Sequence, residues 1–103
     1  MARPQAIEAA LRRLAPLIPD HEAQAVVDHA LASRGLRGAA PESAAWLSLV
    51  AYARHAFTDY DGLLEEGYDR DSARHFVLDD LDAVLKGWGV RRRLADEPEA
   101  GEG

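Results

Sequence analysis

Apolar side chains recur at helical spacing through most of this chain, and no segment alternates apolar and polar residues as a half-buried strand would. The clearest pattern begins at Pro41 and runs to about Phe57. Its apolar face carries Trp46, Leu49, Val50, Ala53 and Phe57. Alanine and leucine are abundant, whereas β-branched residues are sparse. The sequence therefore predicts an all-α fold, a compact bundle of about five short helices.

Prolines bound the first predicted helix. It begins at about Pro4, a residue that suits the first helical turn, and runs to about Leu14 or Leu17, where Pro16 ends or kinks it. The same segment lacks the continuous apolar core and small-residue cleavage site of a signal peptide. No apolar run approaches the roughly 18 residues of a membrane span. We therefore expect a cytoplasmic protein that has no membrane partner.

Capping signals bound the second and fourth predicted helices. The second follows Asp20 as its N-cap and ends near Ser33, with Gly35 as a left-handed stop. The segment 58–61 reads Thr-Asp-Tyr-Asp and matches a capping box, in which a hydroxyl and a carboxylate satisfy the first N–H groups of a helix. This pattern predicts a short fourth helix that stops at Gly67.

The fifth predicted helix is capped by Asp69 or Asp71 and runs to about Lys86 or Trp88. Its apolar stripe consists of Ala73, Val77, Leu81, Val84, Leu85 and Trp88. Large aromatic side chains on such stripes usually pack in the core. We expect this of Trp46, Phe57, Phe76 and Trp88.

Charge and composition set the C-terminus apart. Residues 91–103 begin with three arginines and end in ADEPEAGEG, which has no large apolar side chain to offset the entropy of ordering. We therefore expect a single helical domain over residues 1–90 and a disordered tail, basic and then acidic, over residues 91–103. Residues 41–89 carry ten acids against four basic side chains, within a net charge of −6. Such an acidic body disfavours nucleic acid as a partner.

The chain contains no cysteine, which excludes disulfides, thiolate catalysis and cysteine-ligated metal sites. It also lacks a glycine-rich phosphate loop and the motifs HExxH and GxSxG. Thr58 has a histidine and an aspartate nearby, but the capping role already accounts for its hydroxyl. We therefore expect no catalytic residues and no cofactor.

Polar side chains are densest at the predicted junction of the third and fourth helices. The candidate site comprises Arg54, His55, Thr58, Asp59, Tyr60 and Asp61, joined by Arg74 from the fifth helix. Two guanidiniums beside a hydroxyl and a helix N-terminus would bind a phosphate or carboxylate. The alternative is an ion-pair network that holds the two halves of the fold in register. In either case we expect the Tyr60 hydroxyl to join the network.

A metal site would need two pairs of residues four apart, His55 with Asp59 and His75 with Asp79. Thr58 is expected to end the helix between the first two residues, which separates them. The sequence therefore predicts no metal site.

A local arginine patch is the basis for an alternative function, the binding of nucleic acid or of a phosphate ligand. It would combine Arg54 and Arg74 with the arginines of the first two helices. These are Arg12, Arg13, Arg34 and Arg37. The run Arg91–Arg93 is expected instead to complement the negative C-terminal end of the fifth helix.

The segment from Tyr52 to Trp88 contains a recognisable skeleton of residues. It consists of Arg54-His55, Thr58-Asp59-Tyr60-Asp61, Leu63-Leu64, Gly67, Ala73-Arg74, Val84-Leu85 and Trp88. This skeleton resembles the bacterial family known as domain of unknown function 2293, and the family-like core spans residues 41–89. The family has no established activity, so the resemblance implies no role for any residue.

With no catalytic motif, the sequence predicts a small non-enzymatic domain that interacts with a protein partner or regulates one. The arginine patch leaves nucleic-acid or phosphate binding as the alternative, and a metal-dependent enzyme is a more distant one. A homodimer is a further expectation, because an apolar stripe on the first helix would need a cover in so short a bundle.

Overall fold

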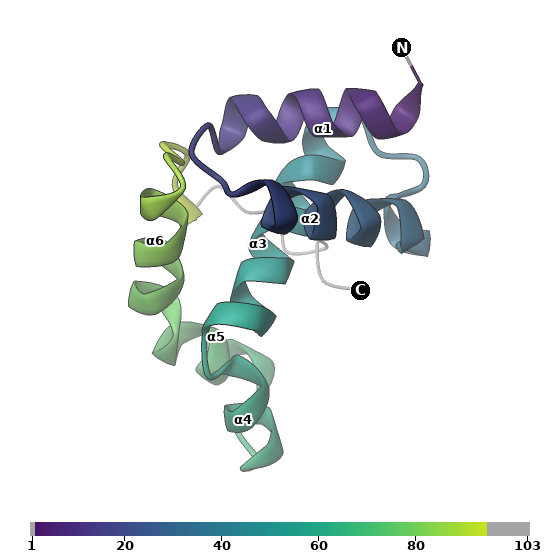
Figure 1. The fold of residues 1–103 in the computed structure, drawn as a ribbon. Helices are drawn as coiled ribbons and strands as arrows, with labels where there is room; N and C mark the ends of the chain where they lie inside the picture. Colours follow the sequence, from purple (N-terminus) through teal and green to yellow (C-terminus); the bar gives the residue numbers. More distant parts are fainter. Residues whose placement is uncertain (1, 95–103) are drawn as a thin grey trace.

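The structure, a computed structural model, describes residues 2–94, and its regular elements over that range are all helical (Figure 1). They are α1 (Arg3–Leu14), α2 (Asp20–Ala32), the 3-10 helix η1 (Arg34–Leu36), α3 (Pro41–Phe57), α4 (Tyr60–Glu65), α5 (Arg70–Phe76) and α6 (Leu78–Gly87). The predicted all-α fold is confirmed. None of these helices is long and apolar enough to cross a membrane. The tail predicted to be disordered lies, from residue 95 on, outside the described residues.

The join between α1 and α2 follows the prolines. Ala15 precedes Pro16 and leaves the helical conformation, with φ −130° and ψ 73°, because the proline ring disfavours a helical residue before it. The prediction that Asp20 caps α2 is wrong, since Pro19 occupies the N-cap and Asp20 is the first helical residue. The Asp20 carboxylate instead accepts a hydrogen bond from Arg12 at 3.0 Å.

Helix α4 stops where the sequence predicts. Gly67 adopts φ 101°, which a residue with a side chain rarely does. The N–H groups of Gly67 and Tyr68 donate to the carbonyls of Leu64 and Leu63, each at 3.1 Å, in the pattern of a Schellman motif. The predicted left-handed stop at Gly35 is wrong, because Gly35 lies within η1 and its φ is not positive.

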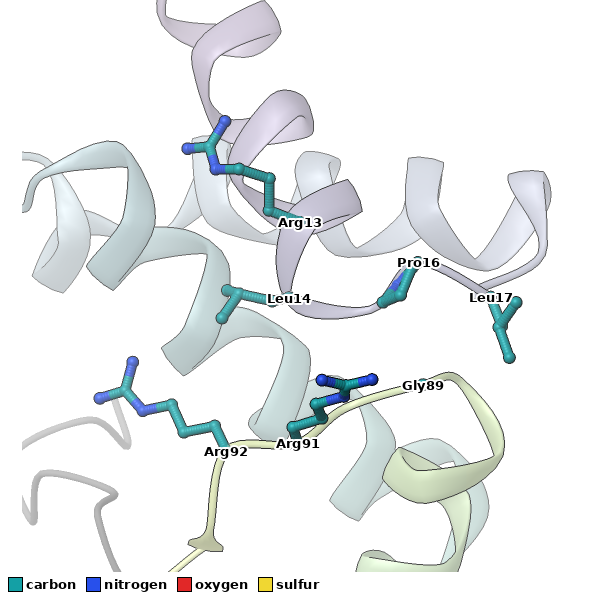
Figure 2. A pocket seen from close by; sticks show the side chains of 7 residues that line it. All are labelled: Arg13, Leu14, Pro16, Leu17, Gly89, Arg91 and Arg92. Carbon is teal, nitrogen blue, oxygen red and sulfur yellow. The ribbon is translucent and has the colours of Figure 1, made fainter.

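Helix α6 also ends in a Schellman motif, at Gly89, a glycine that is not among the predicted helix stops. Gly89 has φ 85°, and the N–H groups of Gly89 and Val90 donate to the carbonyls of Lys86 and Leu85, each at 3.0 Å. A Cβ atom at position 89 would lie 3.0 Å from the Pro16 ring, so the turn after α6 passes directly against the loop after α1 (Figure 2).

The predicted fifth helix is wrong as one element, because it divides at Val77 into α5 and α6. Val77 has φ −99° and ψ 4°, and neither a proline nor a glycine marks the break. Ala73 and Val77 pack against Tyr60, whereas Leu81 and Leu85 pack in a different cluster. The turn at Val77 lets the two halves of one apolar stripe reach two separate cores.

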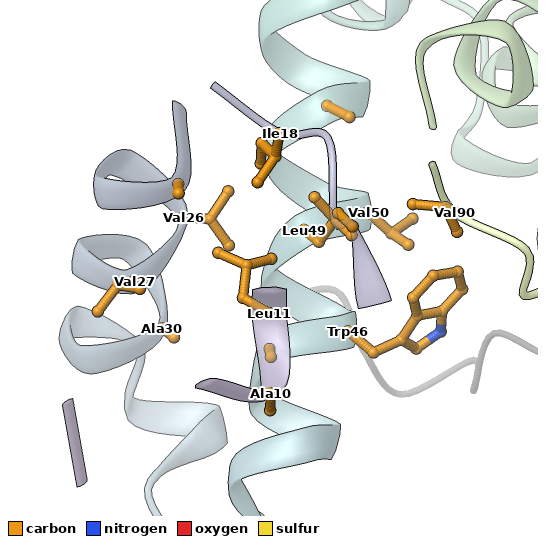
Figure 3. Packing of buried hydrophobic residues seen from close by; sticks show 14 of the residues in the cluster. Ala10, Leu11, Ile18, Val26, Val27, Ala30, Trp46, Leu49, Val50 and Val90 are labelled. Carbon is orange, nitrogen blue, oxygen red and sulfur yellow. The ribbon is translucent and has the colours of Figure 1, made fainter. Parts of the chain in front are cut away.

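The larger cluster, here the main core, fills the space between α1, α2, the first half of α3 and α6. Figure 3 shows Leu11, Val26 and Leu49 meeting from three helices, and each is 0 % exposed. Trp46 extends the main core toward the chain segment after α6, where the guanidinium of Arg92 lies 4.6 Å from a ring centroid of its indole.

The smaller cluster, here the small core, lies at the far end of α3 between α4 and α5 (Figure 1). It consists of the buried residues Tyr60, Ala73 and Val77, with Leu63 and Leu64 partly buried against them. Helices α3 and α6 connect it to the main core.

Two of the four aromatic residues predicted to be in the core are instead exposed. Trp46 and Trp88 are buried, but Phe57 is 42 % exposed and Phe76 is 60 % exposed. Phe57 packs edge-on against the Trp88 ring at 5.3 Å, and Phe76 packs in the same way against Tyr68. Both lie at the last turn of a helix, where the neighbouring helix does not cover them.

Candidate interaction site

The candidate site begins at the junction of α3 and α4. The Thr58 hydroxyl donates to the carbonyl of Arg54, in the last turn of α3, and accepts from the N–H of Tyr60 at 3.3 Å. Only the Thr58 half of the predicted capping box forms, because Asp59, and not Thr58, is the N-cap of α4 and makes no side-chain capping bond. The Asp61 carboxylate is engaged elsewhere. Thr58 therefore connects the end of one helix to the start of the next.

Arg54 supports this junction from inside the protein. Its side chain is 2 % exposed, and its guanidinium carbon lies 5.6 Å from the centre of the Tyr60 ring. Tyr60 is itself 1 % exposed. A cation over the face of a desolvated aromatic ring is attracted by the ring quadrupole, so this contact stabilises the packing of α4 on α3.

His55 and Asp61 form the exposed half of the site. The His55 Nδ1 atom lies 2.6 Å from a carboxylate oxygen of Asp61, and the two side chains are 44 % and 58 % exposed. The His55 ring also packs edge-on against Tyr60 at 5.3 Å. Because it contacts both partners, the imidazole has a defined orientation at the surface.

Tyr60 joins the cluster through its ring and not through its hydroxyl. The ring contacts Arg54 and His55, but no residue between 2 and 94 gives the buried hydroxyl a hydrogen-bond partner. The prediction that this hydroxyl is part of the polar network is therefore wrong. A buried hydroxyl that lacks a partner costs free energy.

The remaining two candidate residues are Asp59 and Arg74. Asp59 is exposed, and its carboxylate rests against the backbone of Gly62, where an added side chain would displace it. Arg74 is partly buried on α5, directly after Ala73, which packs in the small core with Tyr60. The structure thus brings Arg54, His55, Thr58, Tyr60 and Asp61 into direct contact.

Gly62 is a member of the junction that the sequence analysis does not single out. It lies inside the six-residue helix α4, and the Asp59 carboxylate occupies the space that its side chain would need. A glycine inside a short helix is unfavourable for the helix itself, which is the sequence signal of a close approach at this point.

The two predicted histidine–carboxylate pairs do not share helix faces. Helix α3 ends at Phe57, before Asp59, and the break at Val77 separates His75 from Asp79. Over residues 2–94, the structure contains no group of three or more histidine and carboxylate side chains placed to hold a metal ion.

The fold and the site together define a small all-α protein in which a buried arginine and a buried tyrosine support an exposed histidine–aspartate pair. A family model described as an uncharacterized conserved protein, DUF2293, matches residues 10–89. The chain belongs to that family, as its sequence resemblance implies. No curated protein and no solved structure matches the chain.

Proposed function

We propose that this protein is a protein-interaction module that binds its partner through the surface formed by His55, Asp59, Asp61 and Arg74, here the α3–α4 surface. This surface is supported by the inner contacts of the junction, which are made by Arg54, Thr58 and Tyr60. The observation that carries the proposal is the exposed His55–Asp61 pair, which lies on a buried arginine and a buried tyrosine. Side chains that are already ordered lose little entropy on binding, which favours recognition.

The charge of the surroundings defines the kind of partner. Residues 59–82 carry nine acids against two arginines. Complementary charge accelerates association and selects among partners more than it adds affinity. The proposed partner therefore presents a basic surface.

The alternative function, binding of nucleic acid or phosphate through arginines, has less support. Of the arginines in the predicted patch, Arg54 is buried. Arg12 bonds to Asp20 and lies 3.7 Å from Glu8. These arginines have internal roles in the fold.

The test compares capture of a partner by surface variants that keep the fold. The full chain, His55→Ala, Asp61→Ala and Arg74→Ala are immobilised and exposed to native lysate of the source cells, and the bound proteins are quantified. Gln24→Ala is the matched control, because this exposed α2 side chain bonds to Asp28 on its own helix and lies outside the α3–α4 surface. We expect one abundant basic protein to bind the full chain and the control, and to be reduced about tenfold by Asp61→Ala.

Melting temperatures of all variants are measured first, so that a loss of folding is not mistaken for a loss of contact. A photo-crosslinking side chain at position 61 should then label the same protein, whereas one at position 24 should not. Equal capture by the Asp61→Ala and Gln24→Ala variants would exclude the α3–α4 surface as the contact.

A further inference from the structure

A groove with basic walls lies where the segment after α6 meets the loop after α1, and none of the residues that line it belongs to the α3–α4 surface. It has a volume of about 540 Å³ and runs between the last turn of α1, the loop after it and the segment after α6 (Figure 2). Volumes of this size are typical of sites that enclose a ligand group. Three arginines line it, Arg13, Arg91 and Arg92, and its lining contains no acidic side chain.

The apolar part of the groove comes from the loop after α1. Leu14 and Pro16 line it, together with Leu17, which is 69 % exposed and is the most exposed large apolar side chain among the described residues. An exposed leucine between arginines is a contact surface for a ligand that carries both an apolar group and negative charge.

The groove is fixed by the backbone on both sides. The N–H of Leu17 donates to the carbonyl of Trp88 at 2.9 Å, and Gly89 approaches the Pro16 ring so closely that a side chain at position 89 would collide with it. Both walls are therefore held together before any ligand arrives, which lowers the entropy cost of binding.

The arginines of the groove differ in their other contacts. Arg13 is exposed, while the adjacent Arg12 is turned toward Asp20 and Glu8. Figure 2 shows the Arg91 side chain reaching from the segment after α6 toward the loop after α1. Arg92 lies over the Trp46 ring, which orients its guanidinium. The guanidinium group presents several N–H donors in a geometry that suits a carboxylate.

We propose that this groove binds an acidic peptide segment of a partner protein, with carboxylates on the three arginines and an apolar side chain against Leu14, Pro16 and Leu17. A peptide fits better than a nucleic acid, because none of the residues that line the groove is aromatic and bases would have no ring on which to stack. The carboxylates of a short peptide would also lie within the groove. A longer polyanion would extend over the acidic surface of the protein, which would repel it. The site is separate from the α3–α4 surface.

Fluorescence anisotropy tests the proposal with a labelled peptide that alternates leucine and glutamate. Two control peptides replace glutamate by glutamine or leucine by alanine, and a labelled oligothymidine strand tests for nucleic acid. The peptide is titrated with the full chain and with a variant in which Asp96, Glu97, Glu99 and Glu102 are changed to their amides. In that variant the acids of the chain itself cannot compete for the groove.

The decisive variants carry equal changes of charge. Arg13→Gln with Arg91→Gln removes two groove arginines, and Arg34→Gln with Arg37→Gln removes two exposed arginines that do not line the groove. We expect the first pair to weaken peptide binding about tenfold and the second to leave it nearly unchanged. Leu17→Ala should weaken binding as well, without a change in the salt dependence.

Several outcomes would overturn the proposal. One is that the peptide binds neither the full chain nor the amide variant. Others are equal losses in the two arginine pairs, equal binding of the glutamine peptide, or tighter binding of oligothymidine. His55→Ala with Asp61→Ala should bind the peptide normally, so failure at the groove and failure at the α3–α4 surface are distinguishable.

Discussion

Among residues 2–94, helices from both halves of the chain bury twenty side chains in the main core at one end of α3, whereas α4 and α5 enclose a small core of three at the other end. The small core has less apolar surface to bury and therefore a smaller hydrophobic contribution to stability. It compensates with contacts of another kind, the Arg54 guanidinium over the Tyr60 ring and the Thr58 bonds to both helices. Burial therefore organises one end of α3, and directed polar and aromatic contacts organise the other.

This difference has a consequence for local stability. Regions with few buried apolar contacts open at lower free energy than the whole protein unfolds. We therefore expect backbone amides in α4 and α5 to exchange with solvent faster than those in α1, α2 and the first half of α3.

The largest expected effect is that of Leu49→Ala. This side chain is 0 % exposed in the middle of the main core, so its truncation should cost about 3 kcal/mol of unfolding free energy. For a domain of this size, such a loss lowers the melting temperature by roughly 15 °C. Calorimetry measures it, and hydrogen exchange should show that both ends lose protection. An effect confined to α1 and α2 would contradict the central position of α3.

Arg54→Ala should have the next largest effect, about 2 kcal/mol, through the loss of a buried side chain and of its contact with Tyr60. We expect hydrogen exchange to accelerate in α4 and α5 while α1 and α2 keep their protection. The control is Arg34→Ala, an exposed arginine whose loss should change stability by less than about 0.5 kcal/mol. Uniform acceleration over the whole chain would show that the two ends unfold as one unit.

The loss of the hydroxyl group should change the free energy of unfolding in opposite directions at two tyrosines. Tyr60→Phe removes a buried hydroxyl that no described residue pairs with, and should stabilise the protein by about 1 kcal/mol. Tyr52→Phe removes a 2.6 Å bond to Glu22 between α3 and α2, and should destabilise it by about 1 kcal/mol. Urea denaturation of both variants measures the two changes. Destabilisation by Tyr60→Phe would mean that its hydroxyl has a partner after all.

The smallest expected effect concerns pH. His29 lies at the surface, but partial desolvation, and to a lesser degree the charge of His55, lowers its pKa from the ordinary value of 6.5. The unfolded chain therefore takes up this proton more readily than the folded protein, and stability falls as the pH drops through 6.5 and toward the folded-state pKa. Melting temperatures from about pH 7.5 to about pH 5.5 measure the slope, and His29→Gln should flatten it. An unchanged slope would assign the pH dependence to other groups.

Local signals in the sequence predicted the elements that depend on a single turn of chain. Pro41 begins α3, Asp69 accepts the N–H of Ser72 as the N-cap of α5, and Gly67 ends α4. The polar cluster from Arg54 to Asp61 was also predictable as a cluster. Its internal bonds were not, because Asp61 pairs with His55 and not with the helix N-terminus that the capping-box pattern assigns to it.

The all-α class, the bounds of α3 and the stop after α4 are predictable from the sequence, because helical periodicity, prolines and glycines act over a few residues. Tertiary packing, in contrast, determines that the last long apolar stripe breaks at Val77, that Tyr60 is buried and that Phe76 is exposed. It also brings Gly89 against Pro16, which joins the two walls of the groove. The reason is that an apolar stripe indicates which face of a helix is buried. The packing of segments distant in the sequence determines which core each part of that face contacts.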